Sequence, residues 1–246
     1  MCYKQERNSK MKTIVHRADS RGYADHGWLK SYHTFSFAGY YNPERMNFGA
    51  LRVLNDDYVA GGNGFGRHPH SNMEIISIPL EGTLAHGDSM GNNGTISPNE
   101  IQVMSAGTGV EHSEYNASKT DPVKFLQIWL FPNQENVAPR YDQIKIDPSD
   151  RQNKLQQIIS PNPDDEGSWI HQDAWFHLTD MDAELSLEYT FNAEGNGLYI
   201  FVLEGAIQVA DTELHRRDAI GITEVDKLQI KALEKSSILF IEVPMF

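Results

Sequence analysis

Four potential metal ligands occur in two short pairs that stand far apart in the sequence. His68 and His70 flank a proline, and His112 and Glu114 flank a serine. Because the side chains of an extended strand alternate between its two faces, each pair directs both of its side chains to one face. Two such strands facing each other inside a β-barrel would bring the four side chains together. Three imidazoles and a carboxylate form a mixed nitrogen and oxygen site that suits a divalent transition metal such as Fe, Ni, Cu, Mn or Zn.

The segment between the two pairs has the pattern of short strands joined by tight turns. Residues 73–80 and 83–88 predict two strands, and residues 101–104 predict a third. The sequence Gly-Asn-Asn-Gly at 91–94 is a strong hairpin signal, and Ala-Gly-Thr-Gly at 106–109 is a permissive turn before the second pair. Short strands at regular spacing with glycine and asparagine turns indicate a closed or sandwiched all-β unit.

Further strands are expected on both sides of this segment. Residues 20–26 are polar and predict a loop, and Asp56-Asp57 predicts a turn. Residues 123–131 are almost continuously apolar, as expected for a buried strand that closes the first barrel. The other strands predicted before the first ligand pair are residues 13–17, 28–37 and 48–55.

Both ligand pairs belong to longer segments with a recognisable family pattern. Residues 62–74 follow the spacing of the first cupin motif, and residues 112–116 match the end of the second. The segments GFGRHPHSNMEIISIPLEG and MSAGTGVEHSEYN, together with residues 33–57, resemble the pirin family of bicupins. Within that family the chain looks most similar to the bacterial pirin-like proteins described as quercetin 2,3-dioxygenases. The resemblance extends from Met11 onward.

The resemblance implies an all-β bicupin, with two tandem antiparallel β-barrels of the jelly-roll (cupin) type. It also implies one divalent metal ion, for which Fe(II) is expected and Zn, Ni, Cu or Mn are compatible with the same donors. His68, His70, His112 and Glu114 occupy the positions of the family's metal ligands. Glu114 would also be the catalytic base.

The acidic residues depart from the general cupin pattern. A standard cupin takes its acidic ligand from the first motif, where this chain has Glu74, and has a proline near the second motif, where this chain has Ser105. The pirin resemblance assigns the carboxylate ligand to Glu114 instead, and Glu114 shares a strand face with His112. Glu74 lies an even number of residues after His70 and could also point inward, so it stays a candidate for supporting the ligands.

The second half of the chain repeats the all-β pattern. We expect an extension or tag remnant at 1–10, an N-terminal metal-binding cupin domain at 11–131, a linker at 132–150 and a C-terminal degenerate cupin domain at 151–246. The linker is rich in Pro, Asn, Gln and Asp, as connectors commonly are. Eight further strands are predicted, at residues 169–172, 175–178, 184–191, 198–203, 206–209, 219–222, 228–232 and 238–243.

A weak internal repeat relates the two halves. Residues 76–88 parallel residues 199–211, with Leu-Glu-Gly in register. This alignment puts Phe191 and Ala193 where the first half has its His-x-His pair. The second half therefore keeps the outline of the first without its ligands, and its remaining histidines predict structural or solvent-facing roles. We expect one metal-binding barrel and one filled barrel.

Other conspicuous residues have more ordinary interpretations. His33 has no spaced partner and is interpreted as a packed strand residue. For His86, a position near the cavity and a structural role both remain open. The glycine-rich residues 61–66 lack the lysine and the following helix of a phosphate-binding loop, so they predict a turn. Phe48 and Phe65 are candidates for stacking on a substrate.

Composition limits the classes of partner. The 246 residues include 34 acidic and 21 basic side chains, which gives a net charge of −13. This charge disfavours direct binding to nucleic acid or to an anionic membrane. No apolar run approaches the roughly 20 residues of a membrane helix. The single cysteine, Cys2, excludes an intrachain disulfide and suits a reducing cytoplasm.

The resemblance leads to two hypotheses of different classes. In the first, a flavonol such as quercetin binds the metal through its 3-hydroxyl, Glu114 accepts that proton, and O2 opens the heterocycle with loss of carbon monoxide. In the second, the protein is a regulator that binds a protein partner according to the redox state of its iron, without physiological turnover. A cupin isomerase or an inert structural cupin is disfavoured because all four ligands are present.

Overall fold

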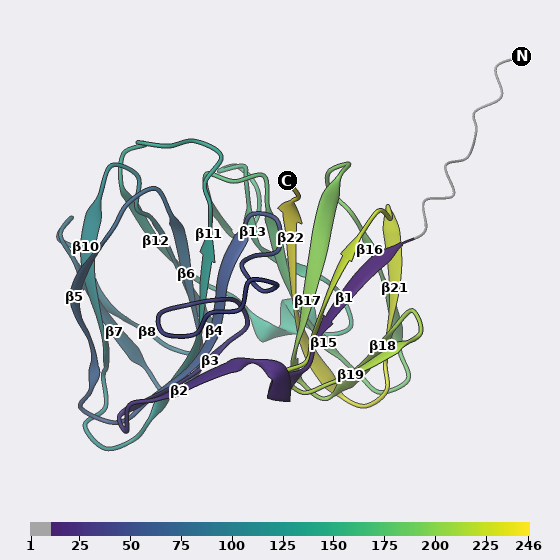
Figure 1. Cartoon of the computed structure of the whole chain (residues 1–246), viewed down its shortest axis with the longest axis horizontal. Helices are drawn as coiled ribbons and strands as arrows, with labels where there is room; N and C mark the ends of the chain where they lie inside the picture. The colour runs from purple at the N-terminus through teal and green to yellow at the C-terminus, as the bar shows by residue number, and fades with distance from the viewer. Residues whose placement is uncertain (1–10) are drawn as a thin grey trace, which may run out of the picture.

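The computed structural model describes residues 11–246, which form two antiparallel β-barrels lying side by side (Figure 1). This arrangement confirms the predicted all-β fold with two tandem barrels. The expected extension at 1–10 lies outside the described residues. A helix that crosses a membrane needs a long apolar run, and no helix within residues 11–246 has one.

The N-terminal barrel is built from two sheets in the described chain. The smaller sheet carries the ligand pairs and runs in the order β5 (Gly64–His70), β10 (Val110–Asn116), β7 (Leu84–Asp88) and β8 (Asn93–Ile96). The larger sheet runs in the order β12 (Arg140–Lys145), β9 (Glu100–Ser105), β6 (Glu74–Glu81), β11 (Val123–Leu130), β4 (Leu51–Val59), β3 (Leu29–His33) and β2 (Gly22–Asp25).

The C-terminal barrel repeats this plan, again within residues 11–246. Its smaller sheet has the order β16 (Ser186–Thr190), β21 (Lys227–Ala232), β18 (Ala206–Val209) and β19 (Thr212–His215). Its larger sheet has the order β1 (Lys12–His16), β20 (Ala219–Thr223), β17 (Asn196–Glu204), β22 (Ser236–Pro244), β15 (Trp175–Met181), β13 (Gln156–Ser160) and β14 (Ser168–Trp169). Two short 3-10 helices, η1 (Ala18–Ser20) and η2 (Pro148–Arg151), accompany the strands.

Two strands lie in sheets that the expected boundaries do not suggest. β1 precedes the whole N-terminal barrel but pairs with β20, and Figure 1 shows it crossing the C-terminal barrel. β12 falls within the expected linker but pairs with β9 at the edge of the N-terminal sheet. The division at 131 and 151 stays a prediction, and β1 ties the start of the N-terminal half to the C-terminal sheet.

The apolar clusters explain why the barrels differ. One large cluster lies between the two larger sheets and takes residues from both halves, among them Ile76, Leu126, Phe176 and Tyr199. A second apolar cluster fills the C-terminal barrel around Ile200. In the N-terminal barrel, the clusters of described residues are small and leave a polar interior between them. One barrel is therefore filled with apolar side chains, as the weak repeat predicts, and the other keeps room for polar groups.

Two local predictions are wrong. Residues 20–26 contain strand β2 as well as a loop, and β2 is an edge strand, where polar side chains can face solvent. Asp56-Asp57 does not form a turn but lies inside β4. Both carboxylates find a hydrogen-bond donor there, Arg217 for Asp56 and Ser31 for Asp57, which lowers the cost of placing them in a central strand.

A buried carboxylate organises the loop of the C-terminal barrel that contains Phe191 and Ala193. The Glu242 side chain is fully buried and accepts hydrogen bonds from the Tyr189 hydroxyl and from the backbone amides of Asn192 and Ala193. The side-chain amides of Asn192 and Asn196 donate to it as well. The segment that aligns with the ligand strand of the first half is thus held by a structural carboxylate.

We expect Glu242→Ala to lower the free energy of unfolding by about 3 to 5 kcal/mol, because it leaves several buried donors without an acceptor. Urea denaturation followed by circular dichroism measures this change. Glu213→Ala is the control, since Glu213 is an exposed carboxylate that pairs with His215, and its effect should stay within about 0.5 kcal/mol. Equal effects of the two substitutions would contradict the structural role of Glu242.

Candidate metal centre

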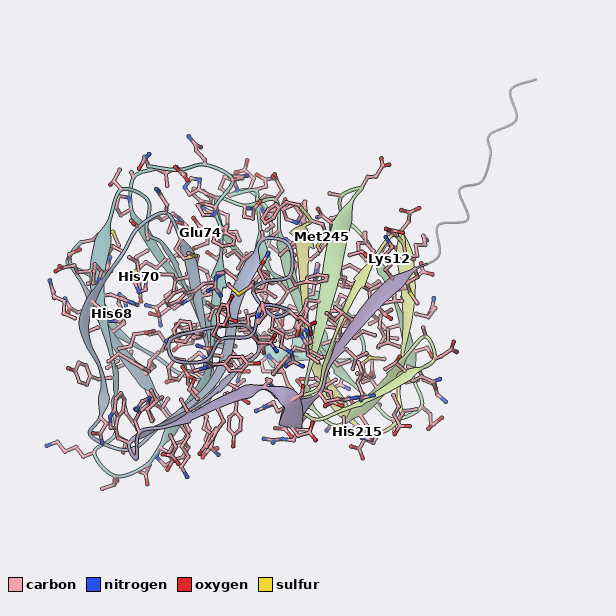
Figure 2. All side chains as sticks on the ribbon, in the orientation of Figure 1. Lys12, His68, His70, Glu74, His215 and Met245 are labelled. Carbon is pink, nitrogen blue, oxygen red and sulfur yellow. The ribbon has the colours of Figure 1, made fainter. Side chains whose placement is uncertain are left out.

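Three histidines from two paired strands converge on one point. β5 and β10 are antiparallel and place His112 directly beside His68. The ring centroids are 4.5 Å apart for His68 and His112, and 4.9 Å apart for His70 and His112. One nitrogen of each of the three rings lies within 4.8 Å of those of the other two. Figure 2 labels His68 and His70 in the outer wall of the N-terminal barrel.

The surroundings favour the neutral form of His70 and of His112, which is the form that binds metals. Burial, and to a smaller extent the electrostatic influence of His68 beside it, lowers the pKa of His70 to about 4. Burial and the adjacent histidines lower the pKa of His112 to about 2. Three protonated imidazoles at these distances would repel one another. Three neutral imidazoles can instead bind one metal cation through their nitrogen lone pairs.

The nitrogen positions fit a transition metal. The Nε2 atoms of His70 and His112 lie 3.0 Å apart. Two ligands at about 2.1 Å from one ion and at a right angle are separated by about 3.0 Å. His68 Nδ1 lies 2.7 Å from the Gly66 carbonyl, which can only accept, so Nδ1 donates and the Nε2 lone pair is available. The three histidines therefore have the chemistry and spacing of a metal site.

Glu114 lies on the same face of β10 but is engaged elsewhere. Its buried carboxylate accepts hydrogen bonds from Ser77 Oγ at 3.0 Å and from Gln127 Nε2 at 3.2 Å. Burial raises the pKa of Glu114 to about 7. The group of ligand atoms within 4.8 Å of one another comprises the three histidines without Glu114. Its role as the fourth ligand stays a prediction.

Glu74 points away from this centre. It lies three residues before Ser77 on the regular strand β6, and therefore on the opposite face. Its carboxylate accepts a hydrogen bond from Ser105 Oγ at 2.7 Å, and Figure 2 labels it closer to the middle of the molecule than His70. The even spacing from His70 is misleading, because Asn72 has a left-handed backbone (φ 46°) that interrupts the alternation.

Glu74 makes stability depend on pH in a defined direction. Burial raises its pKa from the ordinary 4.5 to about 7, so the folded chain holds a proton that the unfolded chain has already lost. The stability that protonated Glu74 contributes to the folded state is fully present below about pH 4.5 and is lost as the pH rises through about 7. We expect Glu74→Gln to stabilise the metal-free protein at pH 8 by up to about 3 kcal/mol, and to change little at pH 4. Urea titrations at both pH values test this, and a pH-independent difference would contradict it.

His86 and His33, two other histidines of the N-terminal half, have different surroundings. His86 is buried behind His112, with Nε2 at 3.0 Å from Asp88 and its ring stacked on Tyr141. His33 packs edge-to-face on Phe37, as expected for a packed strand residue. Neither histidine belongs to the ligand cluster found among the described residues.

The glycine-rich segment before β5 is a turn that allows close packing. A side chain at Gly64 would come within 2.4 Å of the backbone of Tyr115 on the neighbouring strand. Only glycine therefore lets β5 approach β10 at this point, and the pairing brings His68 to His112. The prediction of a turn entering the ligand strand is confirmed for residues 61–63, whereas residues 64–66 already belong to β5.

A cavity of about 850 Å³ adjoins the histidine cluster. Its wall includes His68 and several aromatic side chains, among them Trp28, Phe37, Phe65 and Trp129. Phe65 thus lines the cavity, as a stacking residue would. Phe48 packs on Tyr199 between the barrels, so the prediction that Phe48 stacks on a substrate is wrong. Strands β2 and β3 and residues 37–40 also contribute to this wall. The sequence does not indicate the contribution of β2, because the polar residues 20–26 predict a loop.

Comparisons with known proteins agree with the fold. The Pirin family model matches residues 14–130, and the model of the quercetinase C-terminal cupin domain matches residues 157–243. A quercetin 2,3-dioxygenase of Escherichia coli K12 is 40% identical over 230 residues, which cover 94% of this chain and 98% of the relative. A pirin-like protein of Caulobacter vibrioides is 38% identical and covers 91% of this chain and 96% of its own. The crystal structure of the bacterial pirin YhhW from Escherichia coli in complex with nickel(II) superposes with a TM-score of 0.91 at 37% identity, covering 96% of this chain and all of that chain.

Proposed function

Because this chain belongs to the pirin family, we propose that it is a metal-dependent dioxygenase that opens the heterocycle of flavonols such as quercetin. The observation that carries the proposal is the aromatic cavity of about 850 Å³ that includes His68 in its wall. Cavities of roughly 300 to 1,000 Å³ suit small organic ligands. A substrate in this cavity would lie beside His68, the histidine of the cluster that lines its wall.

The cavity suits a flat aromatic molecule. Trp28 and Phe65 meet edge-to-face with ring centroids 5.6 Å apart, and Phe37 meets Trp129 in the same way at 5.3 Å. These packed pairs hold rigid aromatic surfaces against the ligand. Stacked and edge-to-face contacts with such surfaces favour planar aromatic rings. The walls would also exclude bulk water from the reacting ring.

We propose that His68, His70, His112 and Glu114 hold the metal, with Fe(II) as the physiological ion. A relative has a structure with nickel(II), and the same donors also suit Zn, Cu and Mn. A bound redox-active metal would supply a Lewis acid for the flavonol 3-oxygen and the one-electron chemistry that O2 requires.

Glu114 is proposed to accept the proton of the flavonol 3-hydroxyl. Burial raises the pKa of Glu114 to about 7 in the metal-free protein, and a bound cation would lower it, so the carboxylate would be ionised and able to accept a proton. Ser77 donates to one carboxylate oxygen and Gln127 to the other, which fixes the orientation of the group. Each oxygen keeps a second lone pair, so the same carboxylate has capacity for both a metal and a proton. In the overall reaction both atoms of O2 enter the opened product and one ring carbon leaves as carbon monoxide.

Oxygen consumption tests the proposal. The protein is purified without oxygen, loaded with Fe(II) and mixed with quercetin and O2, and the uptake of O2 is recorded. We expect saturable, iron-dependent uptake by the wild type and none above background by the His68→Ala/His112→Ala variant. A wild type that holds one iron per chain without consuming O2 would overturn the dioxygenase proposal. It would favour a regulator that binds a protein partner.

A further inference from the structure

A polar row crosses the inner face of the larger N-terminal sheet. Directly paired strand positions lie on the same face, and the pairs here are His33 with Asn55, Asn55 with Gln127, and Gln127 with Ser77. Gln127 and Ser77 are the two residues that donate to Glu114. The row therefore begins at the candidate metal centre and continues away from it along the sheet.

Asp57 extends this polar face into the cavity. It is two residues after Asn55 on β4, so both side chains point to the same side of the strand. Asp57 is only 3% exposed, lines the cavity and accepts a hydrogen bond from Ser31 Oγ. No ion pair involves Asp57 in the described part of the chain. Asp56 points the other way, where its Oδ2 lies 2.8 Å from Arg217 Nε.

The hydrogen-bonding capacity of this region is not used up within the protein. Asn55 is 1% exposed, and both polar atoms of its side-chain amide lack a hydrogen-bond partner within residues 11–246. The Asp57 carboxyl has capacity beyond the bond from Ser31. Buried polar groups without partners are costly, and their persistence in a native structure calls for a ligand or another explanation. Both residues face the interior of the barrel, where Asp57 borders an otherwise aromatic cavity.

We propose that Asp57, oriented by Ser31, is a specificity-determining residue that binds a phenolic hydroxyl on an outer ring of the substrate. The proposal rests on the proposed function and specifies its substrate class as flavonols hydroxylated beyond the 3-position. A phenolic hydroxyl both donates and accepts, so it can pair with the carboxyl in either protonation state. Burial raises the pKa of Asp57 to about 7, which disfavours a permanent negative charge and hence a cationic ligand.

The test compares two ligands that share the metal-binding 3-hydroxyl. Quercetin carries hydroxyls on its outer rings, and 3-hydroxyflavone carries none there. Binding of each to the Fe(II)-loaded protein is measured without oxygen, from the change in ligand absorbance, so that turnover plays no part. The variants are Asp57→Leu, which removes the polar group, and Asp57→Asn, which keeps hydrogen-bonding capacity. Asp56→Asn is the matched control, because it changes a neighbouring carboxylate on the opposite face.

We expect Asp57→Leu to weaken quercetin binding about tenfold and to change 3-hydroxyflavone binding less than twofold. Asp57→Asn should retain most of the preference for quercetin, and Asp56→Asn should affect both ligands equally. If Asp57→Leu does not fold, Asp57→Ser replaces it. Serine offers Ser31 a hydroxyl as acceptor but has no carboxyl group to place in the cavity. Equal loss of both ligands, or no loss of either, would overturn the role of Asp57. Intact discrimination without oxygen consumption would instead overturn only the proposed dioxygenase activity.

Discussion

The variant His112→Ala is expected to lose stoichiometric metal binding, with metal content falling from one ion per chain to less than a tenth. His112 contacts both other rings of the cluster, with its centroid 4.5 Å from that of His68 and 4.9 Å from that of His70, and it is the most buried of the three. Its removal leaves two imidazoles in place of three. Changes to residues that only support metal ligands already cost about 10- to 100-fold in affinity or activity, so the loss of a ligand should cost more.

Metal analysis after Fe(II) loading and gel filtration measures this effect. His177→Ala is the matched control, because His177 is also a buried histidine whose pKa is lowered to about 4, but it lies in the C-terminal barrel. The control should keep one metal per chain. Circular dichroism shows that each variant is folded. A folded His112→Ala protein that retains a full equivalent of metal would refute the assignment of the site.

The second large effect concerns the proton acceptor. Glu114→Gln keeps the size of the side chain and an acceptor for Ser77, but it removes the basic oxygen. We expect the turnover number to fall by about 10²- to 10⁴-fold, which is the usual contribution of general acid–base catalysis. Binding of quercetin should change far less, because the aromatic walls of the cavity are unaltered.

Glu74→Gln provides a stringent control for this variant. Glu74 and Glu114 are both buried, and burial raises the pKa of each to about 7. They differ in that Glu74 contacts Ser105 on the face of β6 turned away from the histidines. Turnover should therefore survive Glu74→Gln within about twofold. Similar losses in both variants would mean that a general change in buried charge, and not the loss of a base, explains the effect.

The centre of the site could be predicted because it depends on local alternation. His-x-His and His-x-Glu each lie within a single strand, so the period of two is enough to place each pair on one face. The convergence of the three histidines then follows from the pairing of β5 with β10. Glu74 shows the limit of that argument. The same even spacing fails there because the chain turns between His70 and β6, at Asn72.

The features that were missed depend on distant contacts. A strand such as β1 has the same local pattern whichever barrel it joins, so its pairing with β20 could not be deduced from its own residues. Asp56-Asp57 has the composition of a turn, and only Arg217 and Ser31 make it acceptable inside a strand. One signal was present in the sequence, however. Ser31 and His33, like Asn55 and Asp57, are polar pairs at the strand period, as expected for a polar barrel interior.

The ratio of carbon monoxide released to O2 consumed tests the central claim most directly. The Fe(II)-loaded protein is given a known amount of O2 with excess quercetin, and both gases are quantified after the reaction. Ring opening by dioxygenation predicts that one carbon monoxide is released for each O2 consumed. The His68→Ala/His112→Ala variant should neither consume O2 nor release carbon monoxide. Consumption of O2 without carbon monoxide would show that the flavonol is oxidised without ring cleavage, and would contradict the account.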